Sequence, residues 1–474
     1  MKKILSLFLT LLLTASLAAC GNQTEGTSGT SVEPSASETQ PAASDTGNET
    51  EPADMSEDTM NSYTFNQNAT IEETILVDEY DVKITATELT YDDYSAELAL
   101  VIENNSDRNL SFIANSIGYS CNSVNGYMLP DGYLNCDVAA GKKATDTISI
   151  AYDSLMAYGI SEIADLEIGF DISDDDYNHT YTGPCAILTS AADSYDYSRT
   201  YYRNTIASEA SQTGNDYSVS YFSTDAVYEE NGLAIVSQTM INNKGGESIL
   251  LLEIENTTGE TVNVSTADID LNGLRIYDST WSSDTINPGK TAIVNIDLSS
   301  VLEPEYWTIY GITDADNVAL KIFFTNEDDE EVSEPAYLSI DISGTEATFS
   351  MEGTEIYNDN GLRLISKGIY ADSSRYSDNL HLLLIAENTS GQTLALHNVY
   401  DSLSLNDYMA SYSYYTTTIE NDVCVMIDIL LWGDDLEDIG ISGPSDIQSV
   451  ELSLTIRDED YTEIDEANIA FTIE

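Results

Sequence analysis

Basic side chains are scarce in this sequence. Its 474 residues include 16 Lys and Arg against 83 Asp and Glu, which gives a formal net charge of −67. Nucleic-acid binding depends on basic patches that neutralise phosphate, so this charge excludes a nucleic-acid partner. The acids are spread along the whole chain, which is typical of a solvated surface that favours cations and basic partners.

Sequence signatures of catalysis are missing as well. The three histidines, His179, His381 and His397, form no HExxH motif and no pair at metal-ligand spacing. The sequence has no Walker loop, no GxSxG elbow and no GxGxxG fingerprint. We therefore expect no catalytic, cofactor-binding or metal-binding residues, and no cofactor. The alternative is an envelope hydrolase with paired carboxylates on one sandwich edge, because so many acids always offer some pair at a suitable distance.

The longest apolar run lies at the N-terminus and is too short to span a bilayer. Two lysines precede an apolar stretch over 4–17, and the letters LAACG follow at 17–21. This order resembles the signal peptide and lipobox of bacterial lipoproteins. The resemblance implies that residues 1–19 are a signal peptide and that Cys20 carries the lipid that anchors the chain at the outer face of the cell membrane. The alternative is an ordinary secretory signal that is cut nearby.

Residues 20–60 are expected to be the lipidated Cys followed by a disordered acidic tether. Residues 21–60 contain no aromatic residue and no Lys or Arg, and Val32 is their one branched aliphatic residue. Such a segment cannot bury enough apolar surface to offset the entropy of ordering. A flexible chain of this length spans about 35 Å, so the folded part would hang off the membrane.

The remaining sequence is rich in residues that favour strands. Tyr is used 31 times, whereas Phe is used 9 times and Trp 3 times; aromatic and β-branched residues are enriched in strands. In its first part, short alternating segments predict strands near 75–88, 95–104, 110–121, 126–136, 144–151, 164–172 and 177–188. A single helical turn is expected at 153–158.

Three copies of one unit follow each other after the tether. The clearest marker is a strand that ends in an Asn turn, IENNS at 102–106, IENTT at 254–258 and AENTS at 386–390. Hairpin signals at 125–126, 272–273 and 406–407, Gly-Ile steps at 159–160, 311–312 and 440–441, and acidic tips at 174–176, 327–329 and 458–460 keep similar offsets. Offsets between copies that stay nearly constant over some 70 residues indicate a true internal repeat.

We therefore predict an all-β chain of three tandem antiparallel Ig-like β-sandwich domains over 72–190, 225–345 and 350–474. Residues 191–224 form a Tyr/Ser-rich insert or linker between the first two domains. In the second copy, Leu250, Leu252 and Ile254 should face the core while Glu253 lies on the opposite face. Since each copy is large enough to close its own core, the interfaces between copies are expected to be small and polar.

The lipobox, the Asn turn and the Gly-Ile step resemble a group of immunoglobulin-like domains of Gram-positive lipoproteins, many of them of unknown function. The resemblance covers 70–474. The two core Cys that flank a Trp in true Ig domains are missing, because the only Trp residues are Trp281, Trp307 and Trp432. The resemblance is therefore one of sandwich architecture.

Three features leave two interpretations each. Cys121 and Cys136 flank the 125–126 turn on neighbouring strands, so they form a disulfide or stay buried thiols. The acidic tips are plain turns, which we favour, or calcium loops. The tyrosines clustered at 195–202 and 408–415 form either cross-strand pairs or a stacking face for sugars or peptides.

These observations predict a non-catalytic cell-surface lipoprotein that acts as a binding, adhesion or scaffolding module. The lipid on Cys20 is expected to attach the chain to the membrane. Its ligand, a protein, peptide or glycan, is not named by the sequence.

Overall fold

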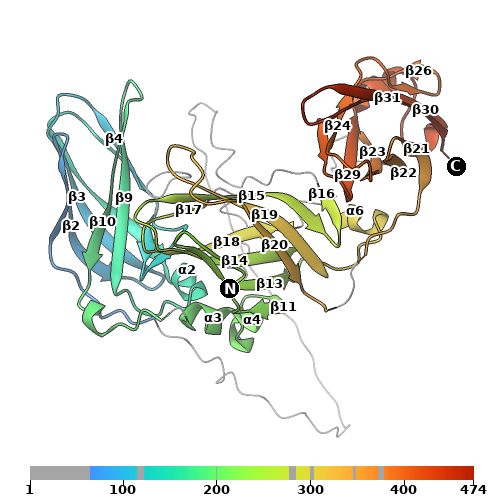
Figure 1. The fold of residues 1–474 in the computed structure, drawn as a ribbon. Helices are drawn as coiled ribbons and strands as arrows, with labels where there is room; N and C mark the ends of the chain where they lie inside the picture. The colour runs from blue at the N-terminus through green and yellow to red at the C-terminus, as the bar shows by residue number, and fades with distance from the viewer. Residues whose placement is uncertain are drawn as a thin grey trace, which may run out of the picture.

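The computed structural model describes residues 65–114, 122–198, 200–276, 284–298, 304–344, 348–371 and 378–473. This part of the chain consists of antiparallel sheets with a few short helices, which confirms the all-β, sandwich-like class. The strands form three groups that follow one another in space from blue through green to red (Figure 1). We call these groups unit 1 (β1 to β10), unit 2 (β11 to β20) and unit 3 (β21 to β31).

Unit 1 consists of two sheets that enclose a core. Its elements are β1 (Thr74–Glu79), β2 (Val82–Tyr91), β3 (Ser95–Asn104), β4 (Leu110–Ala114), β5 (Ser123–Val124), β6 (Tyr127–Met128), β7 (Leu134–Val138), β8 (Lys142–Ala151), α2 (Tyr152–Ala157), β9 (Asp165–Asp174) and β10 (His179–Leu188). One sheet has the order β1-β2-β3-β8, and β10, β9, β4, β5, β6 and β7 belong to the other. The expected first strand, 75–88, is a hairpin, because Tyr80 and Asp81 form a turn with φ of 56° and 58°.

Unit 2 follows a helical linker. The linker holds η1 (Ala192–Ser194), α3 (Thr200–Ile206) and α4 (Glu209–Gly214). Unit 2 holds β11 (Tyr217–Ser223), β12 (Tyr228–Glu230), β13 (Leu233–Asn243), β14 (Ser248–Asn256), β15 (Val262–Leu271), β16 (Leu274–Ile276), β17 (Asp284–Ile286), β18 (Thr291–Asp297), α6 (Pro304–Ile309), β19 (Asn317–Thr325) and β20 (Ala336–Asp341). The last part of the predicted insert, β11, is a strand of the unit 2 sheet that pairs with β13.

Unit 3 repeats this order of strands. Its elements are β21 (Thr354–Asp359), β22 (Leu362–Ala371), β23 (Leu380–Asn388), β24 (Leu394–Asn398), β25 (Ser404–Leu405), β26 (Tyr408–Met409), β27 (Tyr412–Ser413), β28 (Thr417–Ile419), β29 (Val423–Leu431), α7 (Gly433–Asp438), η2 (Pro444–Asp446), β30 (Ser449–Arg457) and β31 (Glu463–Thr472). Strands β21, β22, β23 and β29 form one layer, and β24, β25, β26, β28, β30 and β31 form the other.

The core face of the central strands is the one that alternation predicts. Apolar side chains at every second position of β3, β14 and β23 are at most 1 % exposed: Leu98, Leu100, Ile102, Leu250, Leu252, Ile254, Leu382, Leu384 and Ala386. Each of these strands ends at the Asn turn, which fixes its register. The Gly-Ile step follows a helical turn in every unit, and it buries Ile160, Ile312 and Ile441.

The sheets continue from one unit into the next, which the sequence did not predict. Strand β6 of unit 1 pairs in parallel with β18 of unit 2, at Tyr127 and Thr291. Strand β16 of unit 2 pairs in parallel with β29 of unit 3, at Leu274 with Cys424 and Arg275 with Val425. We call the interface around the first contact, between units 1 and 2, joint 1, and the interface around the second, between units 2 and 3, joint 2.

The expectation that these interfaces are polar is therefore wrong. The core of unit 1 extends to Ile241 and Ile249 of unit 2, and the core of unit 2 extends to Leu383 and Ile385 of unit 3. These side chains lie on the outer faces of β13, β14 and β23. They are buried because the preceding unit packs on those faces.

Candidate binding surface

The Asn turn after the central strand is a structural feature with the same bonds in each unit. In unit 2, the fully buried Asn256 donates from Nδ2 to the carbonyls of Glu260 and Ile286, at 2.9 and 2.8 Å. Its Oδ1 accepts from the backbone N–H and the hydroxyl of Thr258. Asn104 and Asn388 make the equivalent bonds. These residues hold two strands together and are not available to a ligand.

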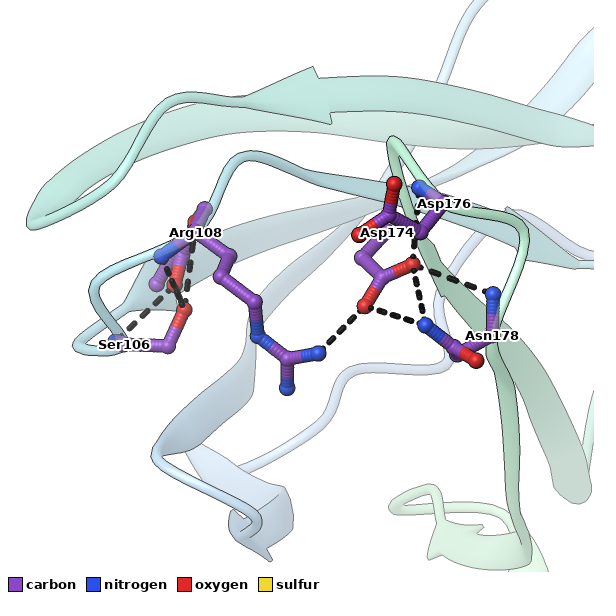
Figure 2. A network of polar contacts seen from close by, with 6 residues as sticks. Ser106, Arg108, Asp174, Asp176 and Asn178 are labelled. Carbon is purple, nitrogen blue, oxygen red and sulfur yellow. Dashed lines mark hydrogen bonds and ion pairs between the residues drawn. The ribbon is translucent and has the colours of Figure 1, made fainter.

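The acidic tips are turns closed by the first side chain of the tip in units 1 and 3 and by the residue just before the tip in unit 2. In unit 1, Asp174 accepts hydrogen bonds from the backbone N–H groups of Asp176 and Asn178, each at 3.0 Å, and also pairs with Arg108 (Figure 2). Hydrogen bonds from Asn178 hold the pKa of Asp174 below its usual range. Asn326 and Asp458 close the tips of units 2 and 3 in the same way. The described residues contain no group of three or more His, Cys, Asp or Glu placed to hold a metal ion.

A short hairpin occurs in each unit, and in units 1 and 2 it supplies the contact to the next unit. Its first turn residue is Asn125, Asn272 or Asn406, with φ of 48°, 52° and 51°. Each of these side chains accepts from two consecutive backbone N–H groups and donates to one carbonyl before the next long strand. The identical bonding shows that the three hairpins are equivalent and are held rigidly.

The residues after the turn differ in exposure between the units. Tyr127 and Met128 follow Asn125-Gly126, and unit 2 covers them to 4 % and 7 % exposure. Tyr408 and Met409 follow Asn406-Asp407 in unit 3, and both are 59 % exposed. Figure 1 places β26 on the side of unit 3 that is far from joint 2. The same dipeptide is thus buried at joint 1 and open in unit 3.

The surroundings of the glycine in the Gly-Ile step also differ between unit 3 and the other two units. A Cβ at Gly159 would lie 2.5 Å from the Tyr201 carbonyl oxygen, and one at Gly311 would lie 2.7 Å from the Ser350 Cβ. A Cβ at Gly440 would meet no described atom within 4 Å. In units 1 and 2 this side is covered by the chain that leads to the next unit, and in unit 3 it faces open space. We call the end of unit 3 formed by β26, α7 and Trp432 the open end.

Joint 1 contains a buried ionic group within an aromatic cluster. The fully buried Glu253 accepts from Arg203 Nε at 2.7 Å, from the Tyr127 hydroxyl at 3.1 Å and from the Ser237 hydroxyl at 2.7 Å. The ring of Tyr202 lies 6.1 Å from that of Tyr127. Burial raises the pKa of Tyr202 well above its usual range. The linker is therefore part of the joint.

A hollow of about 360 Å³ lies at joint 2, lined by Thr308, Ile309, Gly311, Ser350, Glu352, Gly353 and Lys367. Lys367 Nζ donates to the carbonyl oxygens of Ser350 and Glu352. Burial lowers the pKa of this amine. Glu352 is the single acid of the lining, so this hollow offers no pair of carboxylates for hydrolysis.

The cysteines of the sequence prediction are only partly placed. Cys20 and Cys121 lie outside the described residues, so the lipid anchor and the pairing of Cys121 with Cys136 remain predictions. Cys136 is buried on β7, and burial raises the pKa of its thiol to about 11. Cys424 is the residue of β29 that pairs with Leu274 at joint 2.

The histidines and most clustered tyrosines have structural partners. The Nδ1 atom of His179 lies 2.9 Å from a carboxylate oxygen of Asp171, and that of His381 lies 2.9 Å from one of Asp428. The Nδ1 atom of His397 lies 3.0 Å from the Thr416 hydroxyl. Tyr412 and Tyr414 donate to backbone carbonyls of their own unit, and Tyr202 is buried at joint 1. Tyr408 and Tyr415, at 59 % and 82 % exposure, are open to solvent. One sequence signal could have indicated the open end: NGYM at 125–128 recurs as NDYM at 406–409. Alternation and turn preferences alone do not reveal it.

Comparisons with known proteins find solved structures that resemble this chain only weakly. No protein-family model matches the sequence, and no curated protein matches it. A protein of unknown function from Porphyromonas gingivalis W83 aligns over 48 % of this chain and 91 % of its own, with 11 % identity and a TM-score of 0.14. A structure concerned with host cell surface retention of a 1.5-MDa bacterial ice-binding adhesin aligns over 80 % and 90 %, with 9 % identity and a TM-score of 0.12.

A third solved structure, the BSP domain of a biofilm associated protein, aligns over 85 % of this chain and 67 % of its own. Its identity is 10 % and its TM-score is 0.15. The strands and sheets of this chain itself define it as an all-β protein of antiparallel sheets. None of the described helices is long and apolar enough to cross a membrane.

Proposed function

We propose that this chain is a non-catalytic surface lipoprotein that binds a partner through the open end of unit 3. The observation that carries the proposal is the pair Tyr408 and Met409, which is exposed although the equivalent pair in unit 1 is buried by a neighbouring sandwich. Exposed aromatic and Met side chains on a rigid hairpin offer contact area at low entropic cost. Trp432, at 44 % exposure, adds to this surface.

The arrangement of the units supports a role in adhesion or scaffolding. The proposed anchor at Cys20 precedes unit 1, whereas the open end lies in unit 3. The two joints continue sheet hydrogen bonds from one unit into the next, so they hold the open end at a fixed distance from unit 1. A tethered row of units with a contact surface in unit 3 suits a protein that reaches away from the membrane.

Retention of cells under flow tests the binding role. Cells producing the wild-type chain are compared with cells producing Tyr408→Ser/Met409→Ser, at equal surface amounts, on a basic protein, a neutral glycan and a layer of the same cells. We expect retention on at least one coating that the double variant loses and that Tyr177→Ser, an exposed tyrosine of unit 1, keeps. Retention that is equal for the wild type and the double variant would refute the role of the open end.

The anchor is tested separately by changing Cys20→Ser. We expect this variant to leave the membrane fraction while it keeps its fold, because the described residues begin at Phe65, well after the lipid site. A Cys20→Ser chain that stays in the membrane fraction would contradict the lipoprotein assignment.

A further inference from the structure

At joints 1 and 2, the hairpin strand of one unit pairs with the next unit in the same register. In unit 2, Thr291 lies opposite Glu255 in the sheet and receives Tyr127 of unit 1 on its free side. In unit 3, Cys424 lies opposite Glu387 and receives Leu274 of unit 2. The residue after the hairpin turn therefore always bridges to the same position of the next unit, the one opposite the Glu that precedes the Asn turn.

The receiving position is open in unit 1. Lys143 lies opposite Glu103, so it is the equivalent of Thr291 and Cys424. Strand β8 is an edge of its four-stranded sheet among the described residues, and Lys142 and Lys143 are exposed. An edge strand with unpaired backbone groups is a template for pairing with another chain.

An ion pair at joint 1 has matching residues at the two free ends. Lys290 and Glu167 lie 2.8 Å apart across the joint, with side chains that are 11 % and 22 % exposed. Lys142 is equivalent to Lys290. Lys142 lies opposite the turn residue Asn104, and Lys290 lies opposite the turn residue Asn256. Glu451 has the place of Glu167, because each lies opposite a Ser of the hairpin strand, Ser404 or Ser123.

We propose that the open end of unit 3 docks on β8 of unit 1 in a second copy of this chain, with Tyr408 of one copy opposite Lys143 of the other. The inference rests on the proposed binding role of the open end and names its occupant. The contact would repeat joint 1, including the ion pair, which becomes Glu451 of one copy with Lys142 of the other. The basic start of β8 is also complementary to the acidic open end, where Asp434 and Asp435 lie in the first turn of α7.

A head-to-tail contact of this kind does not close into a two-fold dimer. It joins unlike surfaces and leaves one free end of each kind, so copies add in an open row. The contact is weaker than joint 1, because Thr145 of unit 1 lies where unit 2 has the apolar Ile293. We therefore expect association that is reversible and sensitive to salt.

A charge exchange tests the contact on the chain that begins at residue 21. Sedimentation velocity of the wild type is expected to show larger species as concentration rises. Glu451→Lys and Lys142→Glu each place like charges at the contact, and each should weaken association about tenfold. An equal mixture of the two variants restores opposite charges in every contact between unlike copies, so association should return. Glu459→Lys, on an exposed hairpin tip, is the matched control and should behave as the wild type.

Cross-linking then tests the register. Tyr408→Cys mixed with Lys143→Cys should give a disulfide-linked pair of copies under mild oxidation, and Tyr408→Cys mixed with Thr87→Cys should not. A chain that remains a monomer at all concentrations, a mixture that does not restore association, or equal cross-linking to Thr87→Cys would overturn the inference. If the chain stays a monomer but Tyr408→Ser/Met409→Ser still abolishes retention of cells on a protein or glycan coating, the proposed function stands and this occupant is wrong.

Discussion

Tyr127 and Tyr408 have the same position in equivalent hairpins, yet Tyr127 is 4 % exposed and Tyr408 is 59 % exposed. Both come after an Asn whose side chain makes the same three backbone hydrogen bonds. The difference arises from the neighbouring sandwich. Unit 2 covers the hairpin of unit 1, whereas no other unit among the described residues covers the hairpin of unit 3 in the same way.

Asn256→Ala should destabilise unit 2 by about 3 kcal/mol, because it removes four hydrogen bonds of a buried amide, three of which are made to backbone groups. Urea denaturation monitored by tryptophan fluorescence measures the change. Asn358→Ala, on an exposed strand of unit 3, is the control and should leave stability within about 0.5 kcal/mol. A small effect of Asn256→Ala would show that the turn does not depend on this side chain.

Arg203→Met should destabilise joint 1 by about 3 kcal/mol, because it leaves the buried carboxylate of Glu253 without its cation. Adding Glu253→Gln to the same chain should recover most of that loss, since the uncompensated charge is then removed. Lys244→Met breaks an ion pair whose two side chains are 77 % and 60 % exposed, and it should change little. These variants and Glu253→Gln alone are compared by chemical denaturation, and additive effects of Arg203→Met and Glu253→Gln would contradict a coupled pair.

Asp174 should make unit 1 sensitive to acid. Its pKa in the folded chain is lowered, so its contribution to stability is present above the unfolded-state pKa of about 3.9 and is lost as pH falls through the folded-state pKa. Asp174→Ala should therefore lower the melting temperature at neutral pH, and the gap to the wild type should narrow once the pH drops below about 4. Asp176→Ala, which keeps its backbone N–H, serves as control. A gap that is the same at both pH values would rule out the carboxylate as its cause.

Calcium should not stabilise the acidic tips. Asp174, Asn326 and Asp458 already accept backbone hydrogen bonds that close their turns. Titration with calcium, followed by melting temperature, is expected to give only a small change without saturation. A saturable rise that Asp174→Asn abolishes would contradict the assignment of these tips as plain turns.

The sequence was sufficient for those features that depend on alternation and turn chemistry. Leu98, Leu100 and Ile102 are buried because a period of two places them on one face, and the Asn turns follow from residue preferences at strand ends. The same reasoning missed the turn at Tyr80-Asp81, because neither residue is a Gly or an Asn. Units 2 and 3 have Asn231-Gly232 and Asn360-Gly361 there, which would have revealed it by comparison.

The joints could not be found by the same reasoning. Glu253 lies on the face that alternation assigns to solvent, and a carboxylate supports that assignment, yet the residue is fully buried. Its burial depends on Tyr127 and Arg203, which come from another unit and from the linker. Strands of two or three residues such as β6 and β16 also carry too short a pattern to predict their pairing.

Oxidation of methionine tests most directly whether one hairpin is covered and its equivalent is open. The chain is treated with dilute peroxide at a concentration at which it is monomeric, and sulfoxide formation at Met128 and Met409 is followed by mass spectrometry. Met409 is 59 % exposed and Met128 is 7 % exposed, so we predict that Met128 reacts at a rate at least about tenfold lower. The denatured chain, in which the two rates should agree, is the control. Equal rates in the folded chain would contradict both the closure of joint 1 and the open end of unit 3.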